Sequence, residues 1–101
     1  MDNVSVKKTN DSIVLELRGR IDSNNAPAVE TEAAQLIRDA GSGPLVIDAE
    51  GLEYISSAGL RVIVSAQKIM NEQGTMKLVH VNREIKELFE LTGLLNILTI
   101  E

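Results

Sequence analysis

Two adjacent serines, Ser56 and Ser57, precede a stretch of apolar residues at helical spacing, and this position suits chemistry on a hydroxyl group. The first turn of a helix carries backbone N–H groups without intrahelical acceptors, at the positive end of the helix dipole. Such a terminus can stabilise a phosphate. Phosphorylation there would add about −1.5 to −2 charges at neutral pH. Serine is also a favoured helix cap, so the local pattern leaves both interpretations open.

Two aspartates are further candidates for this site. Asp22 is followed by Ser23, Asn24 and Asn25, which is typical of an Asx turn that opens a helix. Asp48 ends an apolar run, and we expect it to organise the serine loop by accepting backbone N–H bonds. We do not expect it to hold a metal, because the spacing offers too few further oxygen ligands.

Enzymatic chemistry has little support in the sequence. A triad of Ser57, His80 and Asp22 can be drawn, but the Gly-x-Ser-x-Gly turn of a serine hydrolase is missing. His80 is the only histidine, and we expect it to be a solvated or core-edge residue late in a strand. The chain has no cysteine, which excludes a thiol nucleophile. We therefore predict no enzyme, no cofactor and no metal.

The elements that position these residues follow from hydrophobic periodicity and turn signals. Alternation predicts two strands that form an N-terminal antiparallel hairpin. The rest of the chain alternates between helices and strands, which predicts parallel pairing with right-handed crossovers. The expected elements are strands at 3–9, 13–18, 45–47, 75–81 and 96–100, and helices from about 24 to 40, 57 to 73 and 82 to 93.

The order β-β-α-β-α-β-α-β predicts one α/β domain over residues 1–101, with a mostly parallel sheet and helices packed against it. The continuous apolar run 45–47 is typical of a strand covered on both faces. The helix at 57–73 is apolar enough to be buried on most sides. Asn24 and Asn25, followed by Pro27, predict a side-chain cap for the first helix.

Charge and hydropathy exclude two kinds of partner. The net charge of −5 opposes binding to nucleic acid. No apolar run approaches the roughly 20 residues that would cross a bilayer. We expect a soluble cytoplasmic protein with an aliphatic core, since its only large aromatic residues are Tyr54 and Phe89.

Three stretches, in the expected order, resemble the STAS-domain family and within it the bacterial anti-sigma factor antagonists. The central one follows Asp48 and has the aromatic-aliphatic-x-Ser-Ala-Gly-Leu form. Many antagonists carry Asp directly before the acceptor serine, whereas this chain has Ser56. The three stretches are Gly19-Arg20-Ile21-Asp22, Tyr54-Ile55-Ser56-Ser57-Ala58-Gly59-Leu60 and Phe89-Glu90-Leu91-Thr92-Gly93-Leu94.

The resemblance implies a switch. The unphosphorylated protein would bind an anti-sigma factor that is also a serine kinase, and so release a sigma factor. Phosphorylation of Ser57, or alternatively Ser56, would prevent binding, and a phosphatase would reverse it. The implied partner-binding residues are Asp22, Ser23, Asn24, Asn25, Ser56, Ser57, Ala58, Gly59, Leu60 and Arg61, with Asp48 in support. We expect a monomer or weak dimer. The alternative is a STAS subunit of a transporter or signalling assembly that is not phosphorylated.

Overall fold

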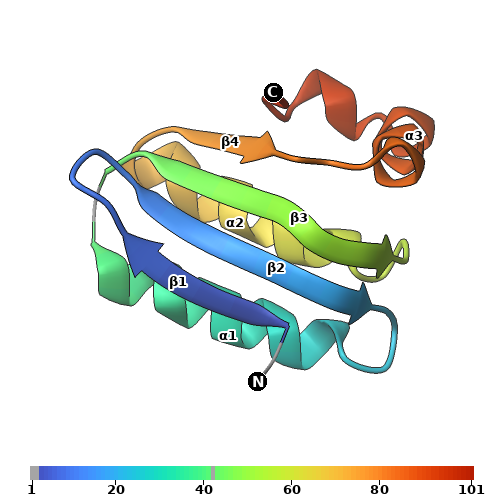
Figure 1. Ribbon diagram of the computed structural model, residues 1–101, viewed down its shortest axis with the longest axis horizontal. Helices are drawn as coiled ribbons and strands as arrows, with labels where there is room; N and C mark the ends of the chain where they lie inside the picture. The colour runs from blue at the N-terminus through green and yellow to red at the C-terminus, as the bar shows by residue number, and fades with distance from the viewer. Residues whose placement is uncertain (1–2, 42) are drawn as a thin grey trace.

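The computed structural model describes residues 3–41 and 43–101 and consists of a four-stranded sheet with three helices (Figure 1). The strands are ordered β1-β2-β3-β4; the first pair is antiparallel and the other two pairs are parallel. This confirms the predicted α/β class and the mostly parallel sheet with an N-terminal hairpin. The elements are β1 Val4–Lys8, β2 Ile13–Ile21, α1 Ala26–Ala40, β3 Leu45–Ile55, α2 Leu60–Gln73, β4 Met76–Val79, α3 Arg83–Thr92 and a 3₁₀ turn Leu94–Asn96.

Both α1 and α2 lie on one face of the sheet (Figure 1). The alternating residues of β2 that face them are fully buried, whereas Glu16 and Arg18 lie on the opposite face and are half-buried. Within the described part of the chain no helix covers that opposite face. α3 and the C-terminal segment instead lie beyond β4, along that edge of the sheet (Figure 1).

This one-sided arrangement corrects two expectations. The run 45–47 is not covered on both faces, because Val46 points to the open face and is only half-buried. The helix α2 is not buried on most sides either. It buries one face, which includes Val62, Ile63 and Met70, and exposes Arg61 and Lys68. An aliphatic helix needs to bury only one stripe when it packs against a single layer.

The strand β3 is longer than predicted. The sequence suggested that it ends at Asp48 and that a loop covers 51–57, but β3 continues to Ile55. Its parallel pairing with β2 continues through two register shifts, one on each side of the Arg18–Gly51 and Gly19–Leu52 pairs. A Cβ at Gly51 would lie 2.9 Å from the Arg18 Cγ, so this glycine permits close approach of the two strands rather than ending one.

The C-terminal part agrees with the prediction for α3 but not for the last strand. Asn82 caps α3 by accepting a 2.9 Å hydrogen bond from the Ile85 N–H, and Gly93 ends the helix in a left-handed conformation at φ 79°. The expected strand at 96–100 is reduced to a single parallel bridge between Leu78 and Ile100. The described helices include none with the length and hydropathy to cross a membrane.

Candidate functional site

The Ser56–Ser57 loop follows the carboxyl end of β3 and is held against the end of β2. The Ser56 N–H donates a 2.9 Å hydrogen bond to the Ile21 carbonyl. A Cβ at Gly59 would lie 2.8 Å from the same carbonyl oxygen and 2.7 Å from the Ile55 Cγ1. Gly59 has an ordinary φ of −67°, so lack of space, and not an unusual conformation, explains the glycine.

Ser56 is the residue that caps the turn into α2. Its Oγ accepts a 3.1 Å hydrogen bond from the Gly59 N–H, and its carbonyl accepts one from the Leu60 N–H at 3.1 Å. The side chain is half-buried. Neither serine is therefore the helix cap that the sequence left open: Ser56 caps the turn before α2, whereas Gly59 is at the N-terminal cap position of the helix and makes no side-chain cap.

Ser57 is placed differently from its neighbour. It is exposed, and its hydroxyl has no hydrogen-bond partner among the described residues. The helix begins at Leu60 rather than at Ser57, and the N–H groups of Gly59, Leu60, Arg61 and Val62 already have acceptors in the loop. Within the described loop from Ser56 to Val62, only the N–H groups of Ser57 and Ala58 have no acceptor. An anion at this loop would therefore meet the turn before the helix.

The segment 22–25 forms a rigid turn beside α1. The Asp22 carboxylate accepts a 3.0 Å hydrogen bond from the Asn24 N–H, which is an Asx turn. The Asn25 Oδ1 accepts from the Asp22 N–H at 2.8 Å, and its amide donates to the Arg20 carbonyl at 2.8 Å. Asn25 directly precedes α1, at the cap position, but makes no side-chain cap, contrary to the prediction, because its oxygen is used within this turn.

The structure brings the two predicted segments together into one surface. A hollow of about 170 Å³ is lined by Ser23 and Ala26 on one side and by Ala58 and Arg61 on the other. Gly59 and Leu60 are buried, so they support this surface from below and offer a partner little area. Its exposed members are Ser23, Asn24, Ser57 and Arg61, and its half-buried members are Asp22, Asn25, Ser56 and Ala58.

Side chains of both positive and negative charge lie next to Ser57. Arg61 follows Ser57 by one helical turn, and its Nε lies 4.0 Å from the Glu30 Oε1 of α1. A second hollow, of about 500 Å³, has Ser57, Glu30, Arg61 and Lys68 on its walls. These long, exposed side chains can rearrange, and a single exposed ion pair contributes little to stability.

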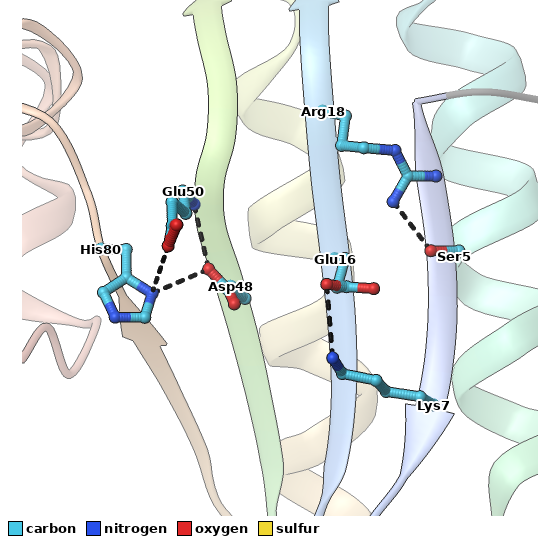
Figure 2. A network of polar contacts seen from close by, with 7 residues as sticks. All are labelled: Ser5, Lys7, Glu16, Arg18, Asp48, Glu50 and His80. Carbon is cyan, nitrogen blue, oxygen red and sulfur yellow. Dashed lines mark hydrogen bonds and ion pairs between the residues drawn. The ribbon is translucent and has the colours of Figure 1, made fainter.

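We expected Asp48 to lie beside the serine loop, but it does not. It is inside β3, and its carboxylate accepts a 3.0 Å hydrogen bond from the Glu50 N–H and lies 2.9 Å from the His80 Nδ1 (Figure 2). The expectation failed because β3 runs seven residues past Asp48. The His80 ring contacts Asp48, and the Asp22 carboxylate accepts the Asn24 N–H within its own turn. Ser57, His80 and Asp22 therefore do not form a triad.

The Asp48–His80 contact shifts the pKa of both groups. The hydrogen bond that the His80 ring donates to Asp48 raises the pKa of the exposed His80 above its usual 6.5, and the charges of Asp48 and Glu50 add to this. Partial burial alone would raise the pKa of Asp48. The hydrogen bonds from His80 and the Glu50 N–H, with the charge of His80, outweigh burial and bring that pKa below 3.8.

The sequence interpretation missed this grouping of Asp48, Glu50 and His80. A signal was present: Asp48 and Glu50 are two residues apart in one strand, which places them on the same face of the sheet. The parallel pairing of Asp48 with Val79 then brings the residue after β4 next to them. That register could not be read from the sequence.

Comparison with known proteins identifies the family that this chain resembles in sequence. The STAS domain family model matches residues 3–101. BtrV of Bordetella bronchiseptica is 34% identical over 98 residues, which are 96% of this chain and 84% of the relative. The anti-sigma-B factor antagonist of Bacillus subtilis is 31% identical over 99 residues, which are 97% of this chain and 89% of the relative.

Solved structures share the fold. The anti-sigma factor antagonist SpoIIAA in its unphosphorylated form superimposes with a TM-score of 0.73 at 16% identity, over 97% of this chain and 87% of that one. SpoIIAA, a Bacillus cell fate determinant, in its phosphorylated form gives 0.67 at 15% identity, over 97% and 90%. At this identity the likeness concerns the fold.

Proposed function

Because the chain belongs to the STAS-domain family, we propose that it is an anti-sigma factor antagonist switched by phosphorylation of Ser57. The unphosphorylated chain binds a cytoplasmic anti-sigma factor that is also a serine kinase, and the sigma factor is released. Phosphorylation ends this binding. In that step the γ-phosphoryl group of ATP is transferred to the Ser57 Oγ, the hydroxyl proton is released and ADP leaves. A phosphatase then hydrolyses the ester with water and returns serine and inorganic phosphate.

The observation that carries this proposal is the different environment of the two serines. Transfer to a hydroxyl requires that its oxygen reach the γ-phosphate of a nucleotide bound to another protein. Ser57 is exposed and without a partner among the described residues, whereas the Ser56 Oγ is occupied by the Gly59 N–H. Modification of Ser56 would break a cap, and modification of Ser57 breaks nothing. The choice between the serines therefore favours Ser57.

A phosphate on Ser57 acts by charge and bulk, without a change of fold. It adds about −1.5 to −2 charges to a chain of net charge −5. The N–H groups of Ser57 and Ala58 and the Arg61 side chain are close enough in sequence to stabilise part of that charge. The rest faces a partner that fitted the uncharged surface formed by segments 22–25 and 56–61, so binding weakens.

The test is phosphorylation with the cognate anti-sigma kinase and ATP, followed by intact-mass measurement. Wild type and Ser56→Ala should each gain the mass of one phosphoryl group, and Ser57→Ala should gain none. In a pull-down with the same kinase, Ser57→Ala should stay bound when ATP is added and Ser57→Asp should bind poorly. Phosphorylation of Ser57→Ala at Ser56, or tight binding by Ser57→Asp, would contradict the proposal.

A further inference from the structure

We propose that Asp48, Glu50 and His80 bind one divalent transition-metal ion, of which Zn²⁺ is the type, on the open face of the sheet. This site is separate from Ser57 and does not depend on the proposed switch. The three side chains come from β3 and from the residue after β4, and they point toward one another (Figure 2). One ligand atom from each lies within 4.8 Å of the other two.

The separations are close to those of a metal site. Ligand atoms at about 2.0–2.2 Å from a zinc ion lie roughly 3 to 3.5 Å from one another. The His80 Nδ1 is 2.9 Å from the Asp48 Oδ1 and 4.0 Å from the Glu50 Oε2. Closing the set requires a movement of the Glu50 carboxylate, which is exposed and on a flexible stem.

The direction of His80 is the least expected part of this arrangement. Met76 and Leu78 are buried on the helix-covered face, so simple alternation would send residue 80 the same way. His80 instead has a left-handed backbone, at φ 59°, and is the only described residue other than glycine with positive φ. Its ring contacts Asp48 on the open face (Figure 2). The left-handed backbone at His80 thus places its imidazole next to the carboxylates of Asp48 and Glu50.

The chemistry of the set favours a borderline transition metal. One imidazole nitrogen and two carboxylates suit zinc or a similar ion better than calcium, which prefers oxygen ligands in larger number. The Glu50 N–H already fixes the Asp48 Oδ1, as outer-shell hydrogen bonds do in metal sites. Next to the set, a hollow of about 400 Å³ leaves room for water to complete the coordination; Asp48, Glu50 and Gly51 of β3 and Glu16, Leu17 and Arg18 of β2 line it. The expectation against a metal at Asp48 considered only oxygen ligands near it in sequence.

The test uses the full chain without an affinity tag, stripped with a chelator and titrated with Zn²⁺. Calorimetry should show saturable binding of one ion per chain. Since His80 is the only histidine, the single imidazole spin system in the NMR spectrum should shift with the same saturation. His80→Asn removes the imidazole with a residue that tolerates the left-handed backbone, and it should lower the affinity at least about tenfold.

Further variants separate this site from general attraction to an acidic protein. Glu50→Gln should also weaken binding, whereas Glu90→Gln, which removes the same charge from the exposed side of α3, should leave the affinity unchanged. The NMR spectrum of each variant checks that the fold is kept. The proposal is overturned if Zn²⁺ does not saturate the wild type, or if folded His80→Asn binds zinc as tightly as wild type does.

Discussion

At the scale of the residue, the two serines of the loop have different environments, because Ser57 is exposed and the Ser56 hydroxyl is hydrogen-bonded. Ser56 stands where many antagonists carry Asp, and it accepts the Gly59 N–H at 3.1 Å. Aspartate is as good a cap as serine. The substitution of Asp by Ser therefore keeps the cap while removing a charge next to Ser57.

This difference between the two serines predicts different effects on stability. Ser56→Ala leaves the Gly59 N–H without its acceptor and should lower the free energy of unfolding by about 0.5–2 kcal/mol. Ser56→Asp should keep most of the stabilisation that the cap provides, because aspartate can accept the same hydrogen bond. Ser57→Ala, which removes an exposed hydroxyl without a partner in the described structure, should change it by less than about 0.5 kcal/mol. Urea denaturation measures all three, and equal losses for Ser56→Ala and Ser57→Ala would show that the cap is misassigned.

At the scale of the element, the sequence predicted which segments are helices and strands better than where they end. The α3 cap at Asn82 and its end at Gly93 depend on local chemistry, and both were predicted. The length of β3 depends on pairing with β2 through two register shifts on either side of Gly51 and Leu52, and local patterns do not contain this information. For the same reason Asp48 was assigned to the wrong neighbours.

The contact between β3 and the end of β4 predicts a pH effect in metal-free protein. The raised pKa of His80 means that its stabilisation of the fold is fully present below pH 6.5 and is lost as pH rises through the folded-state pKa. The lowered pKa of Asp48 means that its contribution is present above pH 3.8 and is lost as pH falls through the folded value. The pair therefore stabilises the fold at pH values between the lowered pKa of Asp48 and the raised pKa of His80.

An NMR titration of the single imidazole, with a chelator present, measures this directly. In Asp48→Asn the hydrogen bond and the charge beside the ring are weakened, so the pKa of His80 should fall toward 6.5. Glu90→Gln again serves as the control and should leave that pKa where it is. An unchanged pKa of His80 in Asp48→Asn would mean that the contact is not maintained in solution.

At the scale of the whole molecule, the proposed switch requires a fold that is stable both with and without the phosphate. The fully buried side chains are almost all aliphatic, and none of the described buried residues is polar or charged. Helices on one face supply this core, while the other face keeps a network of polar side chains, among them Ser5, Lys7, Glu16 and Arg18 (Figure 2). The surface formed by segments 22–25 and 56–61 lies at the end of the sheet, where β2 and β3 meet the turns into α1 and α2.

Phe89 is the exception to the aliphatic core and gives the sharpest test of it. Its ring is 1% exposed and joins α3 to the same core as the sheet. Phe89→Ala should cost about 3–5 kcal/mol, a large part of the roughly 5–15 kcal/mol that stabilises a domain of this kind. Leu91→Ala, on the same helix but 85% exposed, is the matched control and should change stability little. If Phe89→Ala unfolds at the same urea concentration as Leu91→Ala, then α3 is not part of the cooperative core, and the domain that carries Ser57 is smaller than the chain described here.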